Sequence, residues 1–268
     1  MPELNTAGAV THYEDEYFGD PWREPAPVLL IHGVAESSRA WYGWVPHLAR
    51  SMRVLRPDLP GFGGSSVPKG YDWSTTSFAA SLAGFLDAVG VDRAHVVGAK
   101  LGAAIGLQFV ADYPERARSF SFVSGPVRAH DTGGRADLST FPDLIRREGV
   151  RGWAAQTQRA RLGSEVPEEQ IAWWSEFMGG ADPEVCIAVT GMAGGFDLTG
   201  LLGGVKVPTL VVTTADSALA SVETVRSWQE AIPGSELLVL PGDSYHIAAA
   251  SPDECAGHVL EFIRRRGR

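Results

Sequence analysis

Lys100 is the residue of this chain whose type and neighbours most clearly suggest chemistry. Only three of the 23 basic residues are lysines, and Lys100 lies between Gly98 and Gly102, directly after the apolar run 94–97. A lysine with a lowered pKa carries a free amine, which can attack a carbonyl carbon to form a Schiff base or can take up a proton. The plainer alternative is a lysine that extends to solvent and pairs with an acid.

A histidine and an acid nearer the C-terminal end are further candidates. His246 closes the segment 242–246, and Asp216 follows the apolar run 210–212. An imidazole can move protons near neutral pH, and a carboxylate can orient it. Asp216 could equally cap the helix that follows it. The seven histidines show no metal-binding spacing, so no metal is expected.

Short apolar runs between longer amphipathic stretches indicate the elements that must position these residues. The runs are rich in Val, Ile and Leu and lie at residues 28–31, 94–97, 120–123, 210–212 and 237–240. Continuous hydrophobicity is typical of strands that are buried on both faces, and hence of a parallel sheet. Residues 77–89 and 253–266 place apolar side chains on one stripe of a helix. The alternation predicts a doubly wound α/β fold with a mostly parallel sheet.

The strand–helix alternation stops between residues 128 and 205. This stretch has several helix-like pieces, no clear strand and three of the eight tryptophans. It is too long for a plain loop in a compact domain. We therefore predict a helical cap at 128–205, inserted into a core formed by 1–127 and 206–268. An elaborated pair of structural helices is the alternative.

Composition narrows the possible partners. The net charge of −9, without a basic stripe, argues against nucleic-acid binding. No apolar stretch approaches the roughly 18 residues needed to span a bilayer, and no signal peptide is visible. Cys186 and Cys255 form no metal or redox pattern. These features predict a reduced, cytoplasmic protein that binds neither nucleic acid nor membrane. A small-molecule substrate is expected, and the oligomeric state, monomer or dimer, is left open by the sequence.

Three segments in order carry a family resemblance. Residues 28–34 (VLLIHGV) form a strand and a His-Gly turn, residues 56–65 (RPDLPGFGGS) follow the next strand, and residues 95–102 (HVVGAKLG) form a strand and a turn. In order and spacing they resemble the α/β-hydrolase fold family across essentially the whole chain. The resemblance implies that fold, with a helical cap between the sixth and seventh family strands. It also implies that Asp58 is a structural, hydrogen-bonding acid.

The third segment departs from the family at its centre. The family pattern is G-x-S-x-G, a sharp turn that exposes the central side chain and needs glycine for close backbone packing. Both glycines are present here, but the central residue is Lys100, so the usual acyl-serine mechanism is absent. The helix that follows and burial under the cap would lower the pKa of this lysine. Pairing with Asp216 or Glu36 would raise it.

The other site residues are implied by the same resemblance. The backbone N–H groups of Val34 and Leu101 would form an oxyanion hole. His246 takes the place of the family histidine if one residue is inserted, whereas an ungapped match places Tyr245 there.

The acid that would orient this histidine is less regular. An ungapped match places the acid on Ser217, which is not an acid. Our candidate is therefore Asp216, one residue earlier, and Asp131 is an alternative. Three further residues are expected near the pocket: Glu36, Tyr245 and Trp174. Glu36 could equally face solvent, and Trp174 could belong to the core.

Together these features predict an enzyme that acts without a cofactor on a small carbonyl, ester or lactone compound. The reaction would be of the hydrolase or lyase type, at a C–C or C–O bond, with Lys100 in place of serine and His246 handling protons. Lys100 would act through a Schiff base, as an acid or base, or as a cationic clamp. The alternative is a ligand-binding protein that kept the fold and lost the chemistry.

Overall fold

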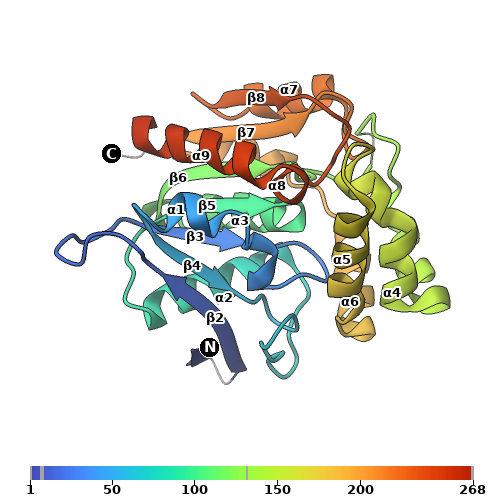
Figure 1. The fold of residues 1–268 in the computed structure, drawn as a ribbon, viewed down its shortest axis with the longest axis horizontal. Helices are drawn as coiled ribbons and strands as arrows, with labels where there is room; N and C mark the ends of the chain where they lie inside the picture. The colour runs from blue at the N-terminus through green and yellow to red at the C-terminus, as the bar shows by residue number, and fades with distance from the viewer. Residues whose placement is uncertain (1, 7–8, 131, 267–268) are drawn as a thin grey trace.

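One mixed sheet forms the centre of the molecule (Figure 1). In this computed structural model, which describes residues 2–6, 9–130 and 132–266, eight strands run in the order β1-β2-β4-β3-β5-β6-β7-β8. The strands β1 and β2 pair antiparallel with their neighbours, and the others are parallel. Their bounds are β1 Glu3–Thr6, β2 Ala9–Glu16, β3 Pro27–Ile31, β4 Arg53–Pro57, β5 Ala94–Ala99, β6 Ala117–Val123, β7 Thr209–Thr214 and β8 Glu236–Leu240.

The five apolar runs all lie in parallel strands, as predicted: β3, β5, β6, β7 and β8. The predicted α/β fold is therefore confirmed. The pair β1 and β2 was not predicted from the sequence. Its residues are mostly polar and partly exposed at the edge of the sheet, so they lack the continuous apolar signal of a buried strand.

Helices cover both faces of the sheet. One apolar cluster packs beneath α2 (Thr75–Ala88), α3 (Leu101–Asp112) and α7 (Val222–Glu230). The other packs beneath α1 (Val45–Leu48), α8 (Ile247–Ala250) and α9 (Pro252–Arg266). The predicted helices at 77–89 and 253–266 correspond to α2 and α9, within two residues at each end.

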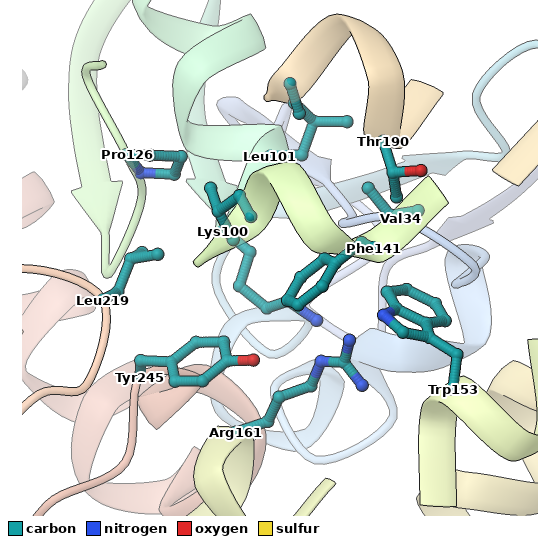
Figure 2. A pocket seen from close by; sticks show the side chains of 12 residues that line it. Val34, Lys100, Leu101, Pro126, Phe141, Trp153, Arg161, Thr190, Leu219 and Tyr245 are labelled. Carbon is teal, nitrogen blue, oxygen red and sulfur yellow. The ribbon is translucent and has the colours of Figure 1, made fainter. Parts of the chain in front are cut away.

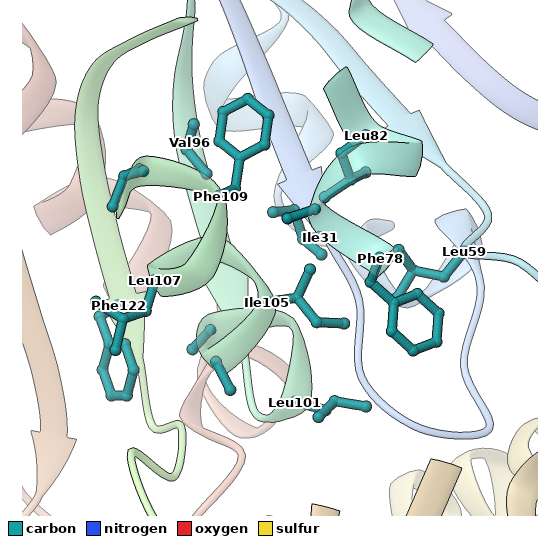
Figure 3. Packing of buried hydrophobic residues seen from close by; sticks show 14 of the residues in the cluster. Ile31, Leu59, Phe78, Leu82, Val96, Leu101, Ile105, Leu107, Phe109 and Phe122 are labelled. Carbon is teal, nitrogen blue, oxygen red and sulfur yellow. The ribbon is translucent and has the colours of Figure 1, made fainter. Parts of the chain in front are cut away.

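The strands contribute alternate side chains to the two clusters, because successive residues of a strand point to opposite faces. In β3, Leu29 and Ile31 belong to the first cluster, and Val28 and Leu30 belong to the second. Figure 3 shows the first cluster, in which Ile31 and Ile105 lie between the sheet and the two helices α2 and α3. This packing fixes the position of the turn between β5 and α3.

A helical insertion lies beside one end of the sheet (Figure 1). It contains α4 (Phe141–Leu162), α5 (Glu168–Gly179) and α6 (Pro183–Ala193), and α4 is kinked at Gly149, whose φ is 70°. Short 3-10 helices lie at η1 Ser38–Trp41, η2 Pro114–Arg116, η3 Leu138–Thr140 and η4 Thr199–Gly204. The insertion matches the expected cap, and its boundaries at 128 and 205 stay a prediction. Among the residues described, no helix combines the length and hydropathy that crossing a membrane requires.

Candidate active site

The turn between β5 and α3 presents Lys100. Lys100 has φ 56° and ψ −122°, a conformation that costs a residue with a side chain roughly 1–3 kcal/mol. The flanking glycines permit it: a Cβ on Gly98 would lie 2.1 Å from the carbonyl oxygen of Gly102, and one on Gly102 would lie 2.0 Å from that of Ile31. The close backbone packing expected of this turn is therefore present, with a lysine at its centre.

A second tight turn, after β3, brings a carboxylate to this lysine. Ala35 has a positive φ of 59° there, and the Glu36 side chain folds back over the turn. Its Oε2 accepts a hydrogen bond of 2.9 Å from the backbone N–H of Gly33, and its Oε1 accepts one of 2.7 Å from Nζ of Lys100. The sequence did not decide whether Glu36 faces the cavity or solvent. In the structure its carboxylate is buried and forms an ion pair with Lys100.

His246 completes a buried group of three side chains. It directly precedes α8, and its backbone N–H donates to the carbonyl oxygen of Arg161 at 2.8 Å. Its Nε2 lies 3.1 Å from Oε1 of Glu36, and its ring packs edge-on against Trp174 at 5.2 Å between centroids. Within the described residues neither ring nitrogen makes a regular hydrogen bond. The imidazole therefore keeps unused capacity for proton transfer.

Burial and charge set the proton affinities of the group in different directions. Burial alone would raise the pKa of Glu36, but the ammonium of Lys100, with help from His246, holds that pKa well below its usual value. Burial lowers the pKa of Lys100 to about 8, against the opposing effect of Glu36. Burial also lowers the pKa of His246 to about 4, and Glu36 again opposes the change. At neutral pH the group therefore holds an ammonium, a carboxylate and a neutral imidazole.

A small cavity of about 50 Å³ opens onto Lys100 (Figure 2). Its polar lining comes from Lys100, Arg161, Thr190 and Tyr245, and the rest is mostly apolar. The ends of the Lys100, Arg161 and Tyr245 side chains point toward one another across it (Figure 2). Burial raises the pKa of the Tyr245 hydroxyl, and the nearby charge of Arg161 opposes this rise. Val34 and Leu101, the proposed oxyanion-hole residues, also line the cavity.

Asp216 does not hold the position expected of an orienting carboxylate. Its side chain is 69% exposed and pairs with Arg135 at 2.8 Å. Its backbone N–H donates to the carbonyl oxygen of Gly242, so the loop holds the residue with its carboxylate outside the buried group. Glu36 is the carboxylate beside His246 instead. Ser217 is buried and accepts a hydrogen bond from the Leu219 N–H, and Asp131 lies outside the described residues.

Trp174 and Arg161 also differ from expectation. Trp174 is fully buried behind His246. Of the expected pocket residues only Tyr245 lines the cavity; Glu36 and Trp174 do not, and His246, which contacts Glu36, does not line it either. Arg161, at the end of α4, lines the cavity although the sequence does not single it out. Arginine is common in this chain, and a buried arginine on a helix has no distinguishing spacing. Across the described part of the chain, no group of three or more metal-binding side chains is present.

Sequence comparison identifies a short region of high similarity. The chain is 41% identical over 95 residues to a 2-hydroxy-6-oxo-2,4-heptadienoate hydrolase of Pseudomonas putida. The match covers 34% of this chain, and the chain spans about a third (34%) of the length of that relative.

Structural comparison extends the similarity to nearly the whole chain. The enol-lactonase of Burkholderia xenovorans superposes with a TM-score of 0.88 over 98% of this chain and 100% of that one, at 21% identity, which shows the fold alone. A thermophilic esterase of Thermogutta terrifontis superposes with a TM-score of 0.83 over 98% of each chain, at 26% identity. The sequence model of the alpha/beta hydrolase fold matches residues 26–169, more than half of the chain. The chain therefore belongs to the alpha/beta hydrolase fold family.

Proposed function

We propose that this chain is a cofactor-independent enzyme that cleaves a C–C or C–O bond next to the carbonyl group of a small ketone, ester or lactone. Lys100 replaces the serine of the family's usual mechanism. The observation that carries the proposal is the buried ion pair of Lys100 with Glu36. Its lysine lines the cavity and lies on the strained turn that the family uses to present its nucleophile.

The proton affinity of Lys100 suits both halves of an acid–base cycle. With a pKa of about 8, roughly one amine in ten is unprotonated at pH 7, against roughly one in three thousand for an ordinary lysine. The ammonium is therefore the main form and can donate a proton, and the amine forms often enough to accept one. Glu36 limits this lowering of the Lys100 pKa, because its negative charge favours the ammonium.

The surrounding groups suit stabilisation of a developing oxyanion. Lys100, Val34 and Leu101 line the same cavity, and Leu101 is the first residue of α3, where an N–H has no partner within the helix. The neutral His246 can accept a proton, and the imidazolium so formed would lie beside the Glu36 carboxylate. We favour this acid–base and clamp role over a Schiff base, because most Lys100 amines are protonated at neutral pH. Water would then attack the carbonyl carbon, and the leaving oxygen or carbon would take up the proton that the water loses.

The relatives are consistent with this reaction class. The similar proteins include a heptadienoate hydrolase, an enol-lactonase and an esterase. We therefore propose a substrate within the range of carbonyl compounds that these names cover.

Turnover of small esters and lactones by Lys100→Met provides the test. Wild type, Lys100→Met and the control Lys206→Met would be assayed with 4-nitrophenyl esters, small lactones and 1,3-diketones between pH 6 and 10. Lys206 is exposed, so its substitution removes the same charge away from the cavity. We expect Lys100→Met to lower kcat/KM by about 10²–10⁴-fold, the usual contribution of an acid–base group, and Lys206→Met to leave it unchanged. An unchanged rate in Lys100→Met would overturn the assigned role.

Borohydride reduction during turnover separates the two routes for Lys100. A reduced adduct mapped to Lys100 by peptide mass analysis would establish the Schiff base, whereas turnover without an adduct supports the acid–base role. Binding of these compounds without any turnover would favour the non-catalytic alternative.

A further inference from the structure

The end of α4 holds a buried cation that the proposed mechanism does not use. Arg161 is 1% exposed and lies at the cavity wall (Figure 2). In the described residues no carboxylate lies within ion-pair distance of its guanidinium. Its Nη1 is instead 3.4 Å from the amide oxygen of Gln158, and its Cζ lies 4.2 Å from the ring centroid of Trp153 and 5.8 Å from that of Phe141.

Burial of this charge is costly for the protein. Arginine stays protonated in proteins, so it cannot escape the cost by losing its proton. A buried cation without an anionic partner forfeits most of its hydration energy, and the face of an aromatic ring recovers only part of it. A cation in this situation at the wall of a cavity is suited to an anion that comes from outside the chain.

The charge balance of the cavity indicates how many negative charges are missing. Lys100 and Glu36 neutralise each other at 2.7 Å, and His246, with a pKa of about 4, is uncharged at neutral pH. The hydroxyl of Tyr245 is also neutral, since burial raises its pKa. One positive charge remains, that of Arg161. A single negative charge balances it, which matches a carboxylate better than a phosphate monoester.

We propose that the cavity takes a substrate with one carboxylate group, which Arg161 binds while Lys100 faces the reacting carbonyl. The part of this proposal that concerns the carbonyl rests on the proposed function. The planar guanidinium can donate two parallel hydrogen bonds to a carboxylate. The cavity of about 50 Å³ is otherwise lined mainly by apolar side chains, so the body of the substrate would be short and largely hydrocarbon.

Calorimetric titration of simple ligands tests the proposal without turnover. Straight-chain carboxylates from acetate to hexanoate would be compared at pH 7 with the amides of the same lengths, which have nearly the same shape and no charge. We expect the best carboxylate to bind wild type at least about tenfold more tightly than its amide, as for a charge-assisted hydrogen-bonded pair.

Three substitutions locate the charge that produces the preference. Arg161→Met should lower carboxylate affinity at least about tenfold and leave amide affinity unchanged within a factor of about two. Arg161→Lys keeps the charge but lacks the planar pair of donors, so its carboxylate affinity should lie between those of wild type and Arg161→Met. Arg159→Met is the matched control: it removes the same charge two residues away on α4, where the side chain is 42% exposed and pairs with Glu168. It should leave the preference unchanged.

Several outcomes would overturn the proposal. These are equal binding of carboxylates and amides by wild type, no binding of any carboxylate, or a preference that survives in Arg161→Met. Near-UV circular dichroism would check that Arg161→Met is folded. If Arg161→Met does not fold, Arg161→Lys serves as the test, and an undiminished preference of that variant for carboxylates over amides overturns the proposal.

The Lys100→Met variant separates this proposal from the proposed function. Loss of turnover with a retained carboxylate preference would support both. A preference that is lost in Lys100→Met but kept in Arg161→Met would assign the anion to Lys100, and would overturn the role of Arg161 alone. A turnover rate that is unchanged in Lys100→Met would count only against the proposed function.

Discussion

The molecule has two buried carboxylates near the ends of neighbouring strands: Asp58 after β4 and Glu36 after β3. Each is 2% exposed, and yet they differ in their partners. Asp58 accepts from the backbone N–H of Ser38 at 2.6 Å and of Gly64 at 2.9 Å. It also contacts Nδ1 of His12 at 2.8 Å. Both oxygens of Asp58 are therefore occupied, mainly by backbone donors, as expected for a structural acid.

Glu36 has one backbone donor, the N–H of Gly33, and its other oxygen faces the ammonium of Lys100 and the imidazole of His246. A backbone N–H neither titrates nor leaves its place, so it anchors a loop. Lysine and histidine side chains can exchange protons with a ligand. The two acids therefore differ in how they are held: backbone N–H groups supply most of the donors to Asp58, whereas Oε1 of Glu36 contacts only side chains that can gain or lose a proton.

Matched amide substitutions are expected to separate the two sites by their stability. Asp58→Asn presents an N–H₂ group to several donors at once and should lower the free energy of unfolding by about 3–5 kcal/mol. Glu36→Gln should cost only about 1 kcal/mol, because Lys100 can lose its proton when the carboxylate is gone. Urea unfolding at pH 7 measures both. An equal loss in the two variants would mean that Glu36 is as structural as Asp58.

The pH dependence of stability should report the buried imidazole of His246. Its pKa of about 4 in the folded protein lies below the ordinary value of 6.5, so the unfolded chain binds more protons between these values. The stabilisation is complete above pH 6.5 and is lost as the pH falls toward 4, by up to about 3 kcal/mol. His95, whose pKa burial also lowers to about 4, acts in the same direction.

The variant His246→Asn isolates this contribution in urea unfolding between pH 4 and 7. Its unfolding free energy should fall less steeply with acid than that of wild type. His47→Asn is the control, because His47 pairs with Asp253 at the protein surface. Identical acid slopes for wild type and His246→Asn would show that the imidazole is not held neutral by burial.

The smallest effect is expected at Asp216, outside both sites. Asp216→Asn should leave kcat/KM and the urea midpoint unchanged, because the side chain is exposed and its ion pair is with the exposed Arg135. Steady-state kinetics on the substrate used for Lys100→Met would check this. A tenfold fall in kcat/KM would return Asp216 to the catalytic group and remove the contrast drawn for Glu36.

The predictable parts of the molecule depend on short stretches of sequence. The buried strands follow from apolar runs such as 28–31, because a strand buried on both faces must be apolar throughout. The turn at Lys100 follows from Gly98 and Gly102, since a Cβ at either position would overlap backbone atoms. Strand β2, which pairs with the edge strand β1, has no such signal, because its residues are mostly polar and most of them are only partly buried.

The sequence by itself determined the buried parallel strands, the turn after β5 and the lysine at the centre of that turn. Only the tertiary structure decided the partners of that lysine. Glu36 reaches Lys100 because β3 lies beside β5 in the sheet, which joins residues 64 positions apart. Likewise, Arg161 lines the cavity because α4 packs beside the end of the sheet. Ion pairs and buried charges depend on long-range packing, and local patterns of residues carry no record of it.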